Sequence, residues 1–374
     1  MIRILHVFGR MDRGGAETMI MSLYRNIDRS KVQFDFVVHT KDKCDYDDEI
    51  RSLGGKIYSI PSYSGKNHSQ YKRAWNDFFE EHKEYKIVHG HVRSTAAIYL
   101  KIAKKHGLLT IAHSHNTSSG KGLSAIVKNL LQYPIRNIAD YLFACSEFAG
   151  HWLFGEKACK KNNFFILKNA IDVEGFIYNE EVIDEVRKEF NIDGKFVVGN
   201  IARFHPQKNH TFLIDIFKKV HDKNKDAVLM LVGQGDLQQE IKDKVRKLGL
   251  SDNVIFTGVR SDIPDLLQAM DVFVFPSLFE GLGIVAVEAQ AAGLRCIVAD
   301  TIPEEAFVTD LIEVISLKES ADIWAKVVND SFEYERKNTY NDIYKGGYEI
   351  KETSKWLEDF YIQQAHYSTI LRDN

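Results

Sequence analysis

Short apolar runs alternate with helical stretches along almost the whole chain, and this alternation is the feature that most restricts the fold. The first runs predict a strand at residues 2–8, a helix at 16–26 and a second strand at 32–38. Alternation of this kind predicts a parallel sheet with helices on both faces. A second series of the same kind starts near residue 195. We therefore expect an α/β protein with two doubly wound parallel-sheet domains.

A polar turn at residues 191–194 separates the two series, because Asn, Asp and Gly interrupt regular structure there. We expect a first domain at residues 1–190 and a second at 191–347. The final stretch, 348–374, is helical in pattern and rich in aromatic residues. This helix is predicted to pack back onto the first domain, with an oligomer contact as the alternative, and the oligomeric state stays open.

Composition excludes several classes of protein. A formal net charge of -3 argues against a protein that binds nucleic acid. No run approaches the roughly 18 apolar residues needed to cross a bilayer, and the first residues lack the pattern of a signal peptide. We therefore expect a cytoplasmic protein. The cysteines show no zinc or disulfide spacing, so neither a metal nor a disulfide is expected from Cys44, Cys145, Cys159 and Cys296.

Residues 271–293 are predicted to form a strand, a loop and a helix. Glu280 precedes this helix and Glu288 lies inside it, eight positions later. At helical spacing the two carboxylates share one face about 12 Å apart along the axis, too far to share a proton. The spacing suits a nucleotide sugar whose diphosphate faces the free N–H groups beside Gly281 and Gly283. The alternative is a pair of ordinary surface glutamates.

Two cations follow the first strand of the second domain. Arg203 and Lys208 come just after that strand, at the edge where parallel sheets bind their ligands. With the helix after Glu280 they would form a metal-free site for a leaving diphosphate. Neutralising such a leaving group is the main electrostatic demand of glycosyl transfer. The alternative is that both cations are ordinary solvated side chains.

The first domain offers glycines and two histidines near its strand ends. Gly9, Gly14 and Gly15 do not match the spacing G-x-G-x-x-G, and the second strand ends in His39-Thr40, without an acidic partner for a ribose. A dehydrogenase is therefore disfavoured. His113 and His115 lie at the end of a strand, and only His115 is expected to leave the sheet and reach the mouth of a cleft. A purely structural role for these histidines is the alternative.

Residues 121–136 combine apolar and basic side chains in a helical pattern. Such a helix could lie on an anionic membrane surface. Packing of Ile126, Leu130 and Leu131 against the sheet is the favoured interpretation, and the balanced net charge of the chain does not decide between the two.

Eight motifs occur in the order that is typical of one enzyme family. They cover almost the whole chain: GRMDRGGAE, TIAHSHN, ACSEFA, LKNAIDVEGF, IARFHPQKN, LVGQGD, FTGVRSD and FEGLGIVAVEAQAAG. Each is weak alone, but eight in order are specific. The chain resembles the retaining glycosyltransferases of the large bacterial family 4, which includes enzymes of polysaccharide and exopolysaccharide biosynthesis. The resemblance implies the GT-B fold, in which two Rossmann-like, doubly wound parallel-sheet domains face a central cleft.

The resemblance also implies roles for matching positions of the second domain. Arg203 and Lys208 would hold the donor diphosphate. Glu288 would hydrogen-bond the ribose, and Glu280 would touch hydroxyls of the transferred sugar. Further donor-binding positions, largely through backbone groups, are implied at Gly258, Arg260, Gly281, Leu282 and Gly283.

In the first domain, the resemblance places His115 near the sugar. It implies that Gly14 and Gly15 allow close approach of the donor phosphate and the acceptor. The sequence departs from the family pattern at Ala202, where a glycine often precedes the arginine. This substitution weakens the expectation of backbone contacts from that phosphate loop.

The implied function is transfer of a sugar from a nucleotide-diphosphate sugar, with retained anomeric configuration and without a metal or other cofactor. UDP is the commonest donor nucleotide among similar enzymes. The implied acceptor is a saccharide or a lipid-linked saccharide in cell-surface polysaccharide biosynthesis, at the inner face of the cell membrane, which leaves peripheral membrane association open. The alternatives are a non-hydrolysing nucleotide-sugar epimerase, which the wide spacing of Glu280 and Glu288 disfavours, and a non-catalytic nucleotide-sugar-binding protein.

Overall fold

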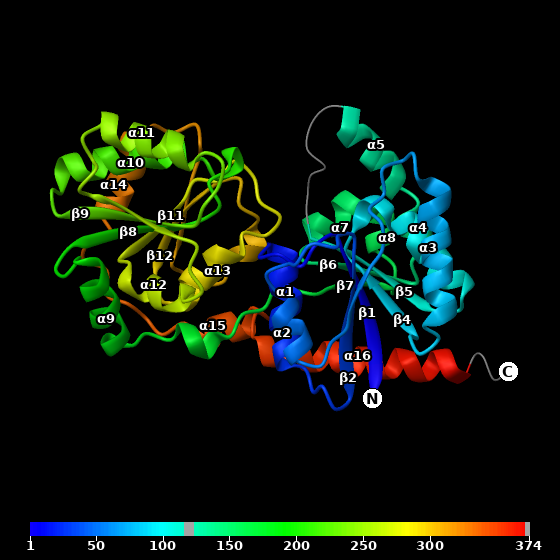
Figure 1. Ribbon diagram of the computed structural model, residues 1–374. Coiled ribbons are helices and arrows are strands. Elements are labelled where there is room, and N and C mark those ends of the chain that lie inside the picture. Colours follow the sequence, from blue (N-terminus) through cyan, green and yellow to red (C-terminus); the bar gives the residue numbers. More distant parts are fainter. Residues whose placement is uncertain (116–122, 371–374) are drawn as a thin grey trace. The chain divides into compact units, whose positions relative to one another are not determined.

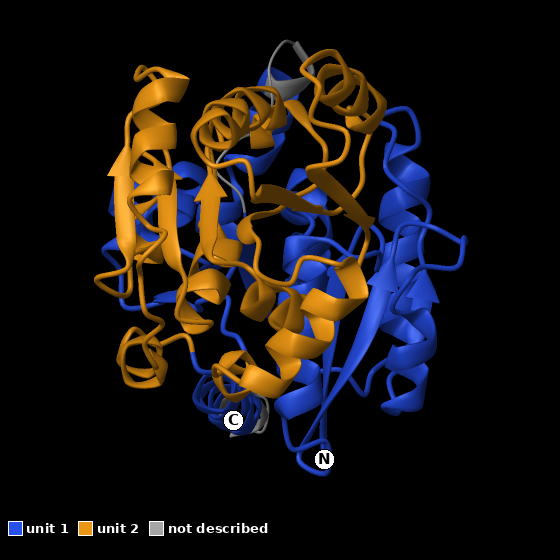
Figure 2. Cartoon of the chain, turned by 90° about the vertical axis from the view of Figure 1, so that its left-hand side faces the viewer, with its two compact units in different colours: residues 1–171, 349–374 blue, residues 172–348 orange. Residues whose placement is uncertain are grey.

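The computed structural model describes residues 1–115 and 123–370 (Figure 1). The chain forms two compact units, which Figure 2 colours separately. Unit 1 comprises Met1–Ile171 together with Glu349–Asn374, and unit 2 comprises Asp172–Tyr348. The chain therefore leaves unit 1, forms all of unit 2, and returns to unit 1 for its last helix.

Unit 1 is built on a parallel sheet of seven strands in the order β3-β2-β1-β4-β5-β6-β7. The strands are β1 (Ile2–Phe8), β2 (Val32–Val38), β3 (Ile57–Ser59), β4 (Ile87–Gly90), β5 (Leu109–Ser114), β6 (Tyr141–Ala144) and β7 (Phe164–Ile166). The strand order reverses between β1 and β4, which pair directly with each other. In open sheets of this kind such a reversal marks the edge where ligands bind.

Helices cover both faces of this sheet, because successive residues of each strand point to opposite sides. Ile4 belongs to the core under one face and Leu5 to the core under the other. The helices of unit 1 are α1 (Gly15–Asn26), α2 (Asp47–Ser52), α3 (His68–Glu81), α4 (Arg93–Lys105), α5 (Leu123–Gln132), α6 (Ile135–Ile138), α7 (Glu147–Phe154), α8 (Glu156–Cys159) and α16 (Ile350–Ile370). The side chains of α3 and α4 fill the core that contains Leu5.

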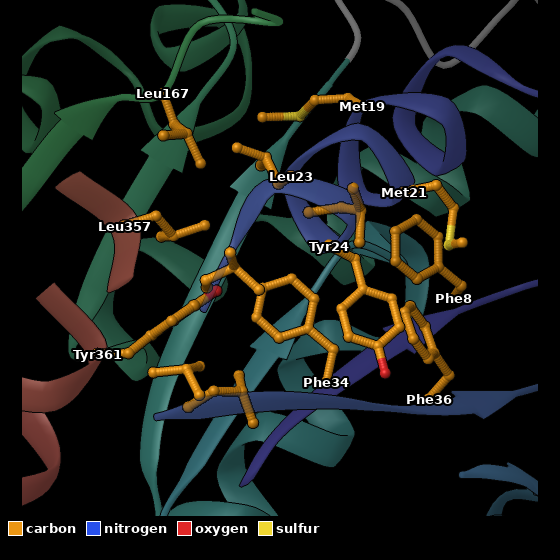
Figure 3. Packing of buried hydrophobic residues seen from close by; sticks show 14 of the residues in the cluster. Phe8, Met19, Met21, Leu23, Tyr24, Phe34, Phe36, Leu167, Leu357 and Tyr361 are labelled. Atoms are coloured by element: carbon orange, nitrogen blue, oxygen red, sulfur yellow. The ribbon is translucent and has the colours of Figure 1, made fainter. Parts of the chain in front are cut away.

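The final helix, α16, completes the face of the sheet that α1 covers. Figure 3 shows Leu357 and Tyr361 of this helix packed among the aromatic side chains of β2 and α1. The ring of Tyr361 meets the ring of Phe34 edge-on, at 6.0 Å between centroids. Glu358 accepts a hydrogen bond from the backbone N–H of Asp28 at 3.0 Å. The helix is thus part of the core of unit 1.

Unit 2 repeats the layered arrangement on a parallel sheet of six strands in the order β10-β9-β8-β11-β12-β13. The strands are β8 (Phe196–Ile201), β9 (Ala227–Val232), β10 (Val254–Gly258), β11 (Val272–Phe275), β12 (Arg295–Ala299) and β13 (Ile312–Ile315). The α-helices are α9 (Glu180–Phe190), α10 (His210–Lys223), α11 (Gln238–Lys247), α12 (Ile263–Ala269), α13 (Ile284–Ala291), α14 (Ala321–Asn329) and α15 (Tyr340–Lys345). The expected α/β class with two doubly wound parallel sheets is confirmed.

The border between the units differs from the one placed at residues 190 and 191. Helix α9 packs against α12 and belongs to unit 2, so unit 2 begins before α9 rather than after it. The turn at residues 191–194 therefore lies inside unit 2, between α9 and β8. A polar turn separates any two consecutive elements, whether or not they belong to the same unit. The unit that an amphipathic helix beside such a turn joins depends on where its apolar face packs.

Helix α5 corrects the interpretation of residues 121–136. Ile126 is 56% exposed and Leu130 is 70% exposed, so neither packs against the sheet as favoured from the sequence. Leu131 is half-buried, and residues 121 and 122 lie outside the described residues. Within the described part of the chain, no helix combines the length and apolar character needed to cross a membrane.

Candidate active site

Arg203, Lys208 and Glu280, three of the predicted donor residues of unit 2, follow the carboxyl ends of its strands. A short 3-10 helix, η2 (Pro206–Lys208), follows β8, and the loop with Glu280 follows β11. The two loops are joined by hydrogen bonds: Gln207 Nε2 donates to the carbonyl of Phe279 at 2.8 Å, and Asn209 Nδ2 donates to the carbonyl of Pro276 at 3.1 Å. These bonds hold the two loops in a fixed register.

Lys208 and Glu280 form the central ion pair of this region. Lys208 Nζ donates to Glu280 Oε1 at 2.6 Å, and the Glu280 side chain is only 8% exposed. The same ammonium lies 5.1 Å from the centroid of the Phe275 ring, a cation–π distance. A buried carboxylate needs a cation and further donors to offset its lost hydration. The structure therefore brings together two of the residues that the sequence singled out.

Arg203 lies on the same strand end, but its side chain extends into solvent. Its Nη2 atom is 3.9 Å from Asp236 Oδ2, and the two side chains are 68% and 88% exposed. An exposed pair of this kind contributes little to stability, so the guanidinium stays available to an anionic ligand. Asp236 belongs to the motif LVGQGD, but the sequence alone did not single it out as a partner of Arg203.

Close backbone contact explains why the loop after β9 needs Gly233. Gly233 has a φ of 129°, and a Cβ atom there would lie 2.3 Å from the carbonyl oxygen of Ala202. Its N–H also donates to the carbonyl of Gly258 at 2.8 Å. The loops after β8, β9 and β10 are thus packed backbone to backbone at one edge of the sheet.

Helix α13 begins at Ile284, so Glu280 precedes it and Glu288 lies inside it, as the sequence pattern indicated. Gly283 precedes it with a φ of 81°, in the left-handed region that favours glycine, and no side chain caps the helix. Gly281 is half-buried, whereas the side chain of Leu282 is buried at 4% exposure. Leu282 can therefore present only its backbone to a donor. The positive end of the helix dipole lies beside the Lys208–Glu280 pair.

Glu288 occupies the second turn of α13, and its side chain is half-buried. Desolvation of this carboxyl raises its pKa to about 7, well above the value of a glutamate in water. A carboxyl enclosed in this way gains most from a ligand that supplies hydrogen-bond donors. The two hydroxyls of a ribose have that chemistry.

Arg260 follows β10 and Gly258, which has a φ of 74°. Its guanidinium donates to Asp262 at 2.6 and 2.8 Å and to Glu189 at 2.9 Å. The two carboxylates raise the pKa of Arg260, with the hydrogen bonds to Asp262 as the largest cause. Since these acids occupy the side chain, the backbone is the part of Arg260 that is available for a base.

In unit 1, Gly14 and Gly15 mark the start of α1 at the end of β1. Around Gly15 there is open space, because no atom lies within 4 Å of where a Cβ would be. The Glu17 side chain folds back against Gly14 and would lie 2.4 Å from a Cβ there. Burial raises the pKa of the Glu17 carboxyl. The sequence did not single out Glu17.

The two histidines of β5 have different environments. His113 is 2% exposed and hydrogen-bonds His89 at 3.1 Å between Nδ1 and Nε2. His115 lies one residue beyond the end of β5 and is half-buried. Burial, with a smaller contribution from Arg93, lowers the pKa of His115 to about 3, so the ring is neutral at pH 7.

Unit 2 also contains a cavity of about 610 Å³ at the opposite edge of its sheet, near the starts of β8 and β11. The ion pair between Arg187 and Asp271, at 2.8 Å, lines it, as does Arg336. None of the predicted donor residues lines this cavity. Ligands of doubly wound sheets bind at the other edge, so we assign no donor role to it.

Two family descriptions match the chain in order. "Glycosyltransferase Family 4" matches residues 13–174, and "Glycosyl transferases group 1" matches residues 182–349. The chain is 38% identical over 334 residues to the putative glycosyltransferase EpsF of Bacillus subtilis, which covers 87% of this chain and 86% of that protein. It is 26% identical over 304 residues to a UDP-Gal:alpha-D-GlcNAc-diphosphoundecaprenol alpha-1,3-galactosyltransferase of Escherichia coli, covering 76% of each chain.

Solved structures agree on the fold. The crystal structure of Anabaena Alr3699/HepE in complex with UDP and glucose superposes with a TM-score of 0.79 at 17% identity, over 97% of this chain and 100% of that one. Sucrose-phosphate synthase from Thermosynechococcus elongatus superposes with a TM-score of 0.74 at 15% identity, over 97% and 99% of the two chains. Together, the sheets and these matches define a glycosyltransferase of the GT-B fold.

The chain belongs to glycosyltransferase family 4, and its similarity to the Bacillus subtilis protein extends over most of its length. The enzyme class predicted from the sequence is thereby confirmed. An epimerase or a non-catalytic binding protein is disfavoured, because the family descriptions and the relatives quoted above are of glycosyltransferases.

Proposed function

We propose that this enzyme transfers a sugar from a UDP-sugar to a saccharide or lipid-linked saccharide acceptor in cell-surface polysaccharide biosynthesis. The observation that carries the proposal is the Lys208–Glu280 pair at the carboxyl edge of unit 2, beside the uncapped start of α13. The Escherichia coli relative uses a UDP-galactose donor and a diphosphoundecaprenol-linked acceptor, and the Anabaena structure contains UDP and glucose. These two proteins support the proposal of a UDP-sugar donor and a saccharide or lipid-linked acceptor for this chain.

The proposed donor site neutralises the diphosphate without a metal ion or other cofactor. The ammonium of Lys208 and the exposed guanidinium of Arg203 would meet the phosphate oxygens. The first N–H groups of α13 would add donors aimed at the same charge. Such preorganised donors stabilise the negative charge that grows on a leaving diphosphate.

The rest of the donor would extend along α13. Glu288 would accept hydrogen bonds from the ribose hydroxyls, and Glu280 would bind hydroxyls of the transferred sugar beside the backbone of Gly281 and Gly283. Gly258 and the backbone of Arg260 would border the base. Glu280 already accepts a hydrogen bond from Lys208. A carboxylate paired in this way is better suited to orienting a sugar than to removing a proton.

For the chemical step we propose front-face attack. The acceptor oxygen forms a bond to the anomeric carbon on the face from which the diphosphate leaves, and its proton passes to the departing phosphate oxygen. The carbon–oxygen bond to the diphosphate breaks, so the anomeric configuration is retained. His115 would hydrogen-bond the sugar from unit 1, with Gly14 and Gly15 beside the phosphate and the acceptor.

A ligand screen and a transfer assay test the proposal. We expect UDP and UDP-sugars to raise the thermal midpoint more than GDP, ADP and their sugars, with and without EDTA. Transfer is followed with radiolabelled UDP-sugars and lipid-linked saccharides, and the anomer is determined by NMR. Preference for another nucleotide, loss of transfer in EDTA, or sugar epimerisation without an acceptor would each contradict the proposal.

We also propose that α5 brings the enzyme to the inner face of the cell membrane. Ile126, Val127 and Leu130 are 55% to 70% exposed on this helix, and Tyr133 follows it at 60% exposure. The Arg136 guanidinium lies 4.1 Å from the centroid of the Tyr133 ring. An exposed apolar helix next to basic side chains is typical of an interfacial membrane anchor.

Binding to vesicles tests this second proposal. We expect the protein to float with vesicles containing phosphatidylglycerol, and the double variant Ile126→Ser, Leu130→Ser to bind at least about tenfold more weakly, since each side chain would lose about 1.5–3 kcal/mol of burial. Phe332→Ser, in unit 2, is the matched control because Phe332 is also 63% exposed. Equal binding by the double variant and the control would rule out α5 as the anchor.

A further inference from the structure

Five histidines form a stacked cluster toward the carboxyl end of the unit 1 sheet. They lie in or just after three neighbouring strands: His6 in β1, His89 and His91 at β4, and His113 and His115 at β5. The ring centroids of His113 and His115 are 4.0 Å apart, and those of His91 and His115 are 5.0 Å apart. Apolar side chains would fill this part of the core without burying polar nitrogens, so the cluster calls for a chemical role.

Three of these rings, those of His91, His113 and His115, have the spacing of metal ligands. Each offers one ring nitrogen, and the three nitrogens lie within 4.8 Å of one another. Two nitrogens bound to one tetrahedral zinc ion are about 3.3 Å apart, because each Zn–N bond is about 2.0–2.1 Å long. His91 Nδ1 and His115 Nε2 are 2.7 Å apart, so separating these two rings by about 0.6 Å would give zinc geometry.

The three rings also have the protonation state that a metal requires. A metal binds the lone pair of a neutral imidazole. Burial lowers the pKa of His115 to about 3, and it lowers the pKa values of His91 and His113 well below the usual value. All three rings are therefore neutral at pH 7, and an arriving ion has no imidazolium proton to displace.

Neighbouring side chains are placed to orient two of the three ligands. A metal-bound histidine normally donates its second N–H to a hydrogen-bond acceptor. With Nδ1 on the metal, His91 would donate from Nε2 to His6 Nδ1, which lies 3.1 Å away. With Nε2 on the metal, His113 would donate from Nδ1 to His89 Nε2 at 3.1 Å, and His89 Nδ1 would donate to Tyr361 Oη at 2.6 Å. The contacts around both ligands are thus compatible with metal binding.

One of the proposed ligand atoms is buried without a partner. His113 is 2% exposed, and its Nε2 atom has no hydrogen-bond partner among the described residues. A buried polar atom left in this way is unfavourable, and a bound metal would satisfy it. His91 and His115 are half-buried, so this part of the cluster keeps some contact with solvent. The N–H that would remain on His115 Nδ1 has no acceptor in the described part of the chain.

We propose that His91 Nδ1, His113 Nε2 and His115 Nε2 bind a zinc ion or another divalent transition metal that prefers imidazole. Three histidines leave the fourth position of a tetrahedral zinc ion to a water molecule. The set contains no carboxylate, which disfavours magnesium and calcium because these ions prefer oxygen ligands. The ion would join the carboxyl ends of β4 and β5, and it would take no part in neutralising the donor diphosphate.

Bound zinc would also affect transfer. His115 cannot use Nε2 for the ion and for a sugar at the same time, so zinc should inhibit transfer and EDTA should restore it. This consequence alone rests on the proposed function.

A second set, His6, His89 and His91, has the same spacing but suits a metal less well. Both nitrogens of His89 already have partners, Tyr361 Oη and His113 Nδ1. His6 and His89 are also fully buried, whereas two members of the proposed set are half-buried. The set with His113 and His115 is therefore the better candidate.

Zinc binding by the full chain tests the proposal. After treatment with EDTA and dialysis, we expect calorimetric titration with zinc chloride to show one zinc ion bound per chain, even in about a hundredfold excess of magnesium. X-ray absorption of the zinc-loaded wild type should show imidazole nitrogens at about 2.0–2.1 Å and no sulfur at about 2.3 Å. This measurement needs no variant, so it does not depend on whether a substituted core folds.

Matched variants identify the ligands. His113→Phe and His115→Phe each keep an aromatic ring but remove one ligand, and each should weaken zinc binding more than about 100-fold, beyond the effect of losing an orienting partner. His6→Phe removes only the acceptor behind His91 and should weaken binding about tenfold. His68→Gln is the control, because His68 is an exposed histidine outside the cluster, and it should leave zinc binding unchanged. Thermal unfolding shows which variants are folded.

Three results would overturn the proposal: no zinc bound by the folded wild type, zinc held by sulfur, or full zinc affinity in folded His115→Phe. Loss of binding in His6→Phe with retention in His113→Phe would also overturn it, because the ion would then occupy the second set. Zinc that binds without inhibiting transfer would instead contradict the proposed sugar contact of His115. Absence of transfer by the zinc-free wild type would contradict the proposed function and not the metal site.

Discussion

Lys208→Ala should reduce the rate of sugar transfer by about 100- to 1000-fold, because removing one preorganised donor to a developing anion costs about 3 kcal/mol of transition-state stabilisation. Lys208 Nζ is 2.6 Å from Glu280 Oε1, so the variant also removes the ammonium beside a largely buried carboxylate. The measurement is single-turnover transfer from the UDP-sugar, with thermal unfolding measured alongside to show that the fold survives.

Two further variants separate the effect of a charge in the donor site from the effect of a charge elsewhere on the surface. Lys195→Ala is the control, because Lys195 pairs with Asp226 at 3.1 Å and both side chains are well exposed. It should leave transfer unchanged within about twofold. The transfer rate of Arg203→Ala should fall nearly as far as that of Lys208→Ala. If both Lys208→Ala and Arg203→Ala transfer at a near-normal rate, the donor site is wrong.

Glu288→Gln should change the pH dependence of stability. The folded-state pKa of Glu288 is raised from 4.5 to about 7, so this group stabilises the fold below the unfolded pKa and loses that contribution as pH rises through 7. Glutamine does not titrate. Between about pH 5 and pH 8 the difference in unfolding free energy should therefore shift in favour of the variant by up to about 3 kcal/mol, measured by urea unfolding.

The same substitution should weaken donor binding. A ribose donates to the ionised carboxylate, so the KM of the wild type for the donor should fall as pH rises through 7, and Glu288→Gln should lose this dependence. Glu189→Gln is the control, because Glu189 is an exposed partner of Arg260. A stability difference that is flat with pH would show that Glu288 is not desolvated, and unchanged donor affinity would exclude it as the ribose ligand.

The alternation of strands and helices was sufficient to predict the fold class, because the period of each run depends on local geometry. It also placed Arg203, Lys208 and Glu280 at strand ends, where the structure shows two of them in contact. The packing of the helices could not be predicted in the same way. Helix α9 belongs to unit 2, and Ile126 is exposed, because of the surfaces that lie near them in the fold. The local sequence pattern contains no information about those surfaces.

The contacts among the histidines of unit 1 could not be predicted from the sequence for a different reason. His6 and His91 are separated by 85 positions, and His91 and His115 by 24, so their contacts follow from the order of β1, β4 and β5 in the sheet. The spacing of His89 with His91, and of His113 with His115, does place each pair on one face of its strand. This two-residue spacing, combined with the expected strand order, was the feature of the sequence from which the cluster could have been predicted.

The return of α16 to unit 1 makes unit 2 an insertion within the chain of unit 1. The hydrogen bond from Asp28 to Glu358 joins residues 330 positions apart, a separation that would make closure slow for an unstructured chain. Ile171 and Glu349, which flank the insertion, pair with each other as neighbouring strands do. Once unit 2 has folded, it acts as a short tether between Ile171 and Glu349, and α16, which is synthesised after unit 2, completes the core that β1 and α1 began.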